Sequence, residues 1–220
     1  MDVKIDIQLK TSFPELKVLI CKIKGVKVEK RNVELESFED EIMKHVRERY
    51  DLESLKDGLT FRAYRDFFWK IGIDPTKIRP AAEALIRRVL GGRTIPRINT
   101  LVDTYNLASI KTEIALAAFD ADKLKGELTM RFAEKDEEFL GIGMEKPMLL
   151  KGGEIVVSDG EKLVAVYPYR DADNTKITEK TKNVMLLVCG VPEIGEETLQ
   201  NAARVALEYI LRFCNGEGKM

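Results

Sequence analysis

The spacing of apolar and polar residues divides the chain into opening strands, a cluster of helices, further strands and one last helix. Apolar residues alternate with polar ones over residues 3–9 and predict a strand, and a second strand is predicted over 18–28 with a bend at Gly25. From residue 33 to 55, apolar side chains recur every four residues and predict a helix. The alternating residues of the first strand are Val3, Ile5, Ile7 and Leu9.

Helical and strand patterns then follow in blocks. Helices are predicted over 61–71, from Pro80 to the Gly91-Gly92 pair, over 99–112 and over 196–214. Strands are predicted over 115–119, 127–132, 155–157, 163–167 and 184–189. This order predicts an α+β fold with a mixed sheet or sheets and a cluster of helices, because an α/β fold would alternate strand and helix regularly.

Composition favours one globular domain over residues 1–220. The chain is 45% hydrophobic, which is enough to bury a sizeable core. We distinguish an opening segment of strands and an acidic helix (1–58), a core that carries the motifs described below (60–190) and a C-terminal helix (195–214).

Charge and cysteine content narrow the class of protein. The 36 Lys and Arg nearly balance the 37 Asp and Glu, so a net charge of -1 provides no global field that attracts nucleic acid. The sequence shows neither the roughly 20 apolar residues of a membrane helix nor a signal-peptide block, which predicts a cytoplasmic protein. Cys21, Cys189 and Cys214 lie far apart and are expected to be reduced. The charged fraction of 33% is typical of thermophile proteins rich in ion pairs.

Several kinds of catalytic site are disfavoured. The single histidine, His45, lies in a charged predicted helix and is interpreted as a surface residue, which argues against a Ser-His-Asp triad and against a histidine metal site. Gly141, Gly143 and the Gly152-Gly153 pair lack the spacing of a phosphate-binding loop. We therefore expect no metal, no nucleotide and no other cofactor.

A polar stripe in the helix predicted over 99–112 is the first candidate site. Asn99, Asp103 and Asn106 fall at i, i+4 and i+7 and share one face of a helix whose other residues are largely apolar. Such a stripe can form the wall of a polar pocket. The alternative is structural: Asn99 caps the helix, Asp103 pairs with a basic residue such as Arg97, and Asn106 braces a loop.

The loop between the last two predicted strands is the second candidate. Residues 170–181 are rich in hydroxyl, amide and carboxylate groups, and loops between apolar strands often carry function. The alternative is a solvated turn in which Asp173 or Thr178 bonds the local main chain.

The run from Arg97 to Phe139 resembles the B3/4 editing and tRNA-binding domain of the phenylalanyl-tRNA synthetase β subunit, and the similarity covers roughly residues 60–190. The resemblance is to a free-standing, archaeal-type protein of this family. The similar positions are Asn99, Val102-Asp103, Asn106, Ala118-Phe119-Asp120, Leu124, Gly126, Arg131, Glu137-Glu138, Gly153-Glu154-Ile155-Val156, Asp159 and the loop from Thr175 to Thr181.

The resemblance implies a hydrolytic pocket for the aminoacyl ester of a misacylated tRNA, in which a positioned water and a polarised carbonyl suffice. It implies catalytic roles for Asp103, Asn99, Asn106 and Thr175, with Asp103 orienting water or the α-amino group. Substrate contacts are expected from Arg97, Tyr105, Ser109, Phe119, Glu154, Arg170, Asp171 and Thr178. The segment from Thr60 to Arg97 carries nine Lys and Arg against three acidic residues. Its expected contacts to the tRNA backbone are Arg79, Arg87, Arg88 and Arg93.

One departure from the bacterial synthetase changes this picture. That protein has a His at the position of Ala117, and its acidic residue after the Thr-rich loop falls near Leu187. The bacterial machinery therefore does not transfer whole. Two alternatives stay open: a tRNA-binding module without catalysis, and a pocket for a free amino acid or similar small ligand held by Tyr105, Phe119 or Tyr167. The sequence leaves the oligomeric state undetermined.

Overall fold

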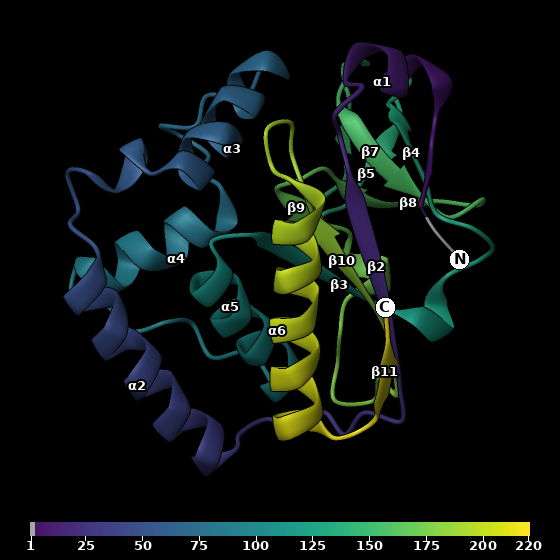
Figure 1. Cartoon of the computed structure of the whole chain (residues 1–220). Helices are drawn as coiled ribbons and strands as arrows, with labels where there is room; N and C mark the ends of the chain where they lie inside the picture. The colour runs from purple at the N-terminus through teal and green to yellow at the C-terminus, as the bar shows by residue number, and fades with distance from the viewer. Residues whose placement is uncertain (1–2) are drawn as a thin grey trace.

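The computed structural model describes residues 3–220, so Met1 and Asp2 of the expected opening segment lie outside the described residues. Residues 3–220 form six α-helices and eleven strands, in the order of strands, helices, strands and a last helix. The strands gather mainly in a central sheet and an outer sheet. The helices lie on one side of the central sheet, except for α1 (Ile7–Ser12), which packs on the outer sheet (Figure 1). The predicted α+β fold class is confirmed.

The central sheet has the strand order β11-β2-β10-β3 and is antiparallel throughout. Its middle strand β10 reads as a continuous apolar run, as expected for a strand covered on both faces. The register places Ala117 of β3 opposite Leu187 of β10. The strands are β2 (Val18–Lys24), β3 (Ala115–Asp120), β10 (Asn183–Cys189) and β11 (Glu217–Lys219).

The outer sheet has the order β1-β4-β7-β8-β9 and is mixed, because β1 pairs with β4 in parallel while the other neighbours are antiparallel. Its strands are β1 (Lys4–Ile5), β4 (Thr129–Phe132), β7 (Ile155–Ser158), β8 (Leu163–Val166) and β9 (Arg170–Asp171). A separate hairpin, which the sequence did not predict, consists of β5 (Glu138–Phe139) and β6 (Met148–Leu149).

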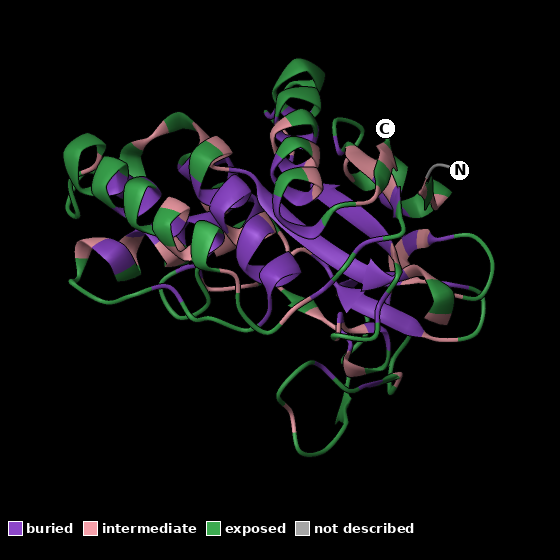
Figure 2. Ribbon diagram, turned by 90° about the horizontal axis from the view of Figure 1, so that it is seen from below, coloured by how far each residue is buried: buried purple, intermediate pink, exposed green. Residues whose placement is uncertain are grey.

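The helices are α1 (Ile7–Ser12), α2 (Val33–Arg49), α3 (Leu59–Lys70), α4 (Ala81–Leu90), α5 (Thr100–Thr112) and α6 (Glu196–Cys214). Helix α6 packs on β2 and β10, and α5 packs on β3 and along α6. Figure 2 shows the buried strands in the middle of the molecule, while the outer helices bury only one side. Short 3-10 turns are η1 (Leu55–Asp57), η2 (Ala121–Lys123) and η3 (Asp173–Thr175).

The helix ends agree best with the sequence prediction. The predicted helix over 196–214 matches α6, and Asn99 caps α5. The strand predicted over 3–9 is wrong beyond Ile5: the Asp6 side chain accepts from the Gln8 amide at 2.8 Å and starts α1 instead. Helix α2 also ends at Arg49 rather than at residue 55, because Tyr50 adopts an extended conformation.

Burial agrees with the expectations for His45 and the cysteines. His45 is exposed on α2, and all three cysteines are free and buried. No helix between residues 3 and 220 is both long and apolar enough to span a membrane.

Candidate functional site

A cavity of about 190 Å³ lies at the edge of β3, where the helices and the two sheets meet. Five separate parts of the chain form it: the start of α4, the middle of α5, β3, the segment from β8 to β9, and β10. Its lining residues are Ala81, Tyr105, Asn106, Leu116, Ala117, Ala165, Val166, Tyr167, Pro168, Tyr169, Arg170, Asp171, Leu187 and Cys189.

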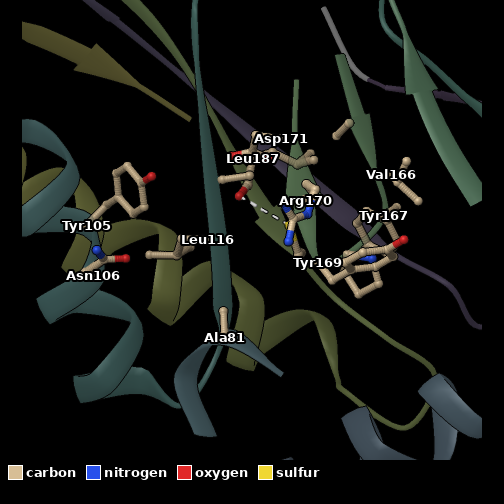
Figure 3. A pocket seen from close by; sticks show the side chains of 14 residues that line it. Ala81, Tyr105, Asn106, Leu116, Val166, Tyr167, Tyr169, Arg170, Asp171 and Leu187 are labelled. Carbon is tan, nitrogen blue, oxygen red and sulfur yellow. Dashed lines mark hydrogen bonds between the residues drawn. The ribbon is translucent and has the colours of Figure 1, made fainter. Parts of the chain in front are cut away.

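The cavity has an apolar floor and a polar rim. Leu116, Ala117 and Leu187 supply the apolar surface, while tyrosine, amide, guanidinium and carboxylate groups come from α5 and β9. Figure 3 shows Tyr105 and Asn106 on one side of β3 and Arg170 on the other. Pockets of this kind suit small amphipathic ligands, because the apolar part holds a side chain and the polar groups fix its orientation.

Asp171 is the acidic side chain of the cavity. Burial raises the pKa of Asp171 to about 7. Its main chain is fixed on two sides, since β9 pairs with β8 and the Asp171 carbonyl accepts from the Ile142 amide at 2.9 Å. A carboxylate with a pKa near neutrality can accept a proton from water or hold an ammonium group.

Arg170 lies between the cavity and the β5–β6 hairpin. Its Nη1 atom donates to the Ile142 carbonyl at 3.4 Å, a long hydrogen bond. The Arg170 side chain crosses Gly141 so closely that a Cβ atom added there would lie 2.4 Å from Arg170 Cδ. The loop of the β5–β6 hairpin therefore fixes the position of the Arg170 guanidinium group.

Two other groups of the cavity are less available for chemistry. The Tyr167 hydroxyl donates to the Gly190 carbonyl, so its ring rather than its hydroxyl faces a ligand. Burial raises the pKa of the Cys189 thiol well above its ordinary value, which keeps it protonated and poorly nucleophilic.

The predicted polar stripe divides into two parts. Asn99 and Asp103 hold the start of α5: the Asn99 side chain accepts from the Val102 amide at 3.0 Å, and Asp103 accepts from the Ile98 amide at 2.8 Å. Asn106 and its neighbour Tyr105 line the cavity instead. Ser109 donates to the Ile114 carbonyl at 2.6 Å and lies in the core.

Arg97 does not form the expected ion pair with Asp103. Its guanidinium bonds Glu36 and Glu39, each at 3.0 Å. Burial raises the pKa of Asp103 to about 6, assisted by the nearby Glu39 charge and opposed by the Ile98 amide and Arg97. The structural alternative is therefore correct that Asn99 caps the helix, and it is wrong that Asp103 pairs with Arg97.

The predicted catalytic residue Thr175 and the other predicted substrate residues lie outside the cavity lining. Phe119 and Thr175 are fully buried, Glu154 accepts from the Lys151 amide at 2.9 Å, and the Thr178 hydroxyl accepts from the Lys180 amide at 3.3 Å. Thr178 and Asn99 instead line a shallow depression elsewhere on the surface. Residues 170 and 171 are the part of the predicted loop that reaches the cavity.

The four arginines expected to contact a nucleic-acid backbone lie in one groove of about 680 Å³ along α4. Arg87 is held by the fully buried Glu83, with Nε 2.7 Å from Oε1, and Arg88 donates to the Thr94 carbonyl. Within residues 3–220, no side-chain hydrogen bond or ion pair engages Arg79 or Arg93, and Lys77 also lines the groove. The groove is therefore cationic, with guanidinium groups available for a polyanion.

Sequence reasoning missed Leu116, Tyr169 and Cys189 as cavity residues. The one local signal for Tyr169 was the aromatic Tyr-Pro-Tyr run before Arg170. Leu116 and Cys189 have no such signal, because their place depends on which strands pair.

Residues 63–215 match the B3/4 domain family, which is more than half of the chain. The chain is 38% identical over 92 residues to the phenylalanine–tRNA ligase β subunit of Fusobacterium nucleatum, covering 41% of this chain and 11% of that subunit. It is 32% identical over 112 residues to the same subunit of Geobacter metallireducens, covering 50% of this chain and 14% of the relative. The chain thus spans a small part of these relatives.

The fold is similar to that of a crystallised N-terminal fragment of the phenylalanyl-tRNA synthetase β subunit from Pyrococcus horikoshii. The two share a TM-score of 0.52 at 15% sequence identity, over 99% of this chain and 50% of that fragment. This likeness concerns the fold alone.

Proposed function

Because the chain belongs to the B3/4 domain family, we propose that it binds the aminoacylated end of a tRNA and hydrolyses a misacylated ester in trans, in the cytoplasm. The relatives named above are phenylalanine–tRNA ligase β subunits, which act on tRNA. The observation that carries the proposal is the cavity at β3, where Asp171, Arg170, Tyr105 and Asn106 surround an apolar floor.

Hydrolysis in this cavity needs one base. The Asp171 carboxylate takes a proton from water while the water oxygen bonds to the acyl carbon. The tetrahedral intermediate then breaks its bond to the ribose oxygen, and Asp171 returns the proton to that oxygen. A pKa of about 7 suits both transfers near neutral pH. Asp103 is less suited, because it lies among the residues that start α5, outside the cavity lining.

The groove along α4 supports the tRNA part of the proposal. Ala81 and Arg88 both lie on α4, where Ala81 lines the cavity and Arg88 lines the groove. The rise of an α-helix therefore separates the cavity from the groove by about 10 Å along α4. An acyl ester in the cavity then leaves the adjoining phosphates close to Arg79, Arg88 and Arg93.

One observation favours a second function, tRNA binding without hydrolysis. The resemblance to the bacterial synthetase implies a His at the position of Ala117 and an acidic residue near Leu187, and these two residues line the cavity as a cross-strand pair. An apolar floor cannot orient water, so catalysis would depend on Asp171 alone.

Incubation with a panel of charged tRNAs, including forms misacylated with tyrosine or methionine, tests the proposal by release of the labelled amino acid. We expect release above the spontaneous rate, and a fall of about 100-fold in the enzymatic rate for Asp171→Asn. Asp173→Asn is the matched control, because Asp173 pairs with Lys176 in the same loop and does not line the cavity.

Two results would contradict different parts of the proposal. If the wild type releases nothing, hydrolysis is excluded and the binding function remains. If Asp103→Asn abolishes release while Asp171→Asn does not, the base lies at the start of α5 and the assignment to Asp171 is wrong.

A further inference from the structure

Strand β3 has an open edge. In the strand order of the central sheet, β3 is terminal and pairs with β10 on one side only. All six of its residues are nevertheless buried. Main-chain groups on a buried edge require partners, and a protein or a ligand must supply them.

Alternation along the strand identifies which main-chain groups face the open edge. The Tyr64 hydroxyl bridges β3 and β10, because it accepts from the Ala115 amide and donates to the Cys189 carbonyl. Ala115 therefore faces β10. In an antiparallel pair this direction alternates, so Ala117 also faces β10, while Leu116 and Ala118 face the open edge.

The cavity lies along this edge. Leu116 and Ala117 are consecutive, so their side chains lie on opposite faces of the sheet, yet both line the cavity. The remaining walls also come from both faces, with Asn106 on the helix side and Tyr167 and Arg170 on the side of the outer sheet (Figure 3). Within residues 3–220, no turn, loop or side-chain hydrogen bond engages the main chain of Leu116.

We propose that an α-aminoacyl group binds the open edge of β3 as a one-residue strand. The acyl oxygen accepts from the Leu116 N–H, and the α-ammonium donates to the Leu116 carbonyl. The inference rests on the proposed function for its substrate class, an aminoacyl ester.

The geometry of an antiparallel pair supports this mode of binding. Two residues in a hydrogen-bonded pair exchange both N–H···O=C bonds, so one residue's amine and carbonyl match the carbonyl and amide of its partner. An α-aminoacyl group contains the same two atoms at the same separation. Addition of an extended ligand to a sheet edge is a known mode of recognition, in which main-chain bonds provide affinity and pockets provide specificity.

The proposal also explains how the cavity polarises a carbonyl without a side-chain donor at Ala117. The Leu116 N–H lies on a fixed strand, so it needs no reorganisation as negative charge develops on the acyl oxygen. Recognition then requires a donor at the α-position, and an acyl group that carries only hydrogen in place of the α-amine loses the bond to the Leu116 carbonyl.

Amide NMR on the ¹⁵N-labelled chain tests the inference directly. The probe is 3′-tyrosylamino-3′-deoxyadenosine, an uncleavable amide, compared with the des-amino analogue that bears hydrogen in place of the α-amine. We expect the Leu116 amide signal to shift and to become protected from exchange on binding, with Ala118 unaffected. The des-amino analogue should bind about tenfold more weakly.

Two proline variants provide a second measurement. Proline is tolerated where a strand N–H faces the open edge, so Leu116→Pro and Ala118→Pro each remove one edge donor and leave the bonds to β10. Leu116→Pro should weaken the probe by about tenfold or more, and Ala118→Pro should not. Leu116→Ala, which shortens the side chain and keeps the N–H, should retain the protected amide.

The outcomes separate the inference from the proposed function. Binding of the probe without a change at the Leu116 amide overturns the inference, whatever the hydrolysis assay shows. A shifted and protected Leu116 amide in a chain that hydrolyses no ester supports the inference and excludes the deacylase. If the wild type binds neither the probe nor charged tRNA, both are overturned.

Discussion

Two aspartates with raised pKa values differ in what surrounds their carboxyl groups. Burial raises the pKa of Asp171 to about 7 and of Asp103 to about 6. Asp171 faces a cavity, whereas Asp103 accepts from the Ile98 amide and lies near Glu39. A raised pKa therefore marks a candidate base at Asp171 and a structural carboxyl group at Asp103.

Asp103 should make the protein less stable as pH rises. Its pKa is about 6 in the folded chain, above the roughly 3.9 of an unfolded aspartate, so the proton is bound more tightly in the native state. The contribution of Asp103 to stability is largest below pH ~4 and is lost, by about 2–3 kcal/mol, as pH rises through 6. Asp103→Asn keeps an acceptor for Ile98, so denaturation should show a gain at pH 8 and none at pH 4.

Asp159 provides a control of opposite sign. Burial alone would raise the pKa of Asp159, but Lys162 and three main-chain amides hold it below its usual range. Asp159→Asn should therefore lose stability at pH 8 and lose less at low pH. A loss of stability at pH 8 for Asp103→Asn as well would mean that the ionised Asp103 stabilises the fold.

Elements defined by local chemistry were predictable from the sequence, and elements defined by pairing were not. Helix α5 begins where Asn99 caps it, and α6 follows the apolar period of residues 196–214. Helix α1 was not predicted, because apolar and polar residues alternate there as in a strand. The Asp6 side chain nevertheless caps a helix. The cavity was only partly predictable, since no local pattern shows that β3 is an edge strand beside β9.

The β5–β6 hairpin should act on the cavity through Gly141. The loop cannot retreat, because Ile142 N donates to the Asp171 carbonyl and Asp173 N donates to the Leu140 carbonyl, each at 2.9 Å. A Cβ atom at residue 141 would therefore displace Arg170. Gly141→Ala should weaken the amide probe by about tenfold, as Arg170→Ala does, with little change in the free energy of unfolding.

A double-mutant cycle, read by calorimetric titration, separates this effect from damage to the fold. If Gly141 acts through Arg170, the double variant Gly141→Ala/Arg170→Ala binds no more weakly than Arg170→Ala alone. Gly195→Ala is the control, because an added Cβ there has nothing within 4 Å. Additive losses would show that the loop affects the cavity by another route.

At the scale of the whole molecule, charge is distributed so that one helix connects two surfaces of different chemistry. The net charge is -1, yet the groove along α4 gathers Lys77 and four arginines, while the start of the same helix lines the cavity. If the proposed function holds, a tRNA binds the groove through its phosphates and the cavity through its acyl group. A short ester that has no upstream phosphates uses the cavity alone.

This division predicts different effects on long and short substrates. Replacing both Arg79 and Arg93 with Ala removes two phosphate contacts, which should reduce the slope of log affinity for tRNA against log salt by about 1.4 if the contacted strand is single. Hydrolysis of an aminoacyl-adenosine ester should stay unchanged in the same variant, because the cavity is intact. Arg204 lies on α6, outside the groove. The control Arg204→Ala should therefore change neither the salt slope nor the rate of ester hydrolysis. An unchanged salt slope would show that tRNA does not use this groove, and a slower reaction of the short ester would show that groove and cavity are one site.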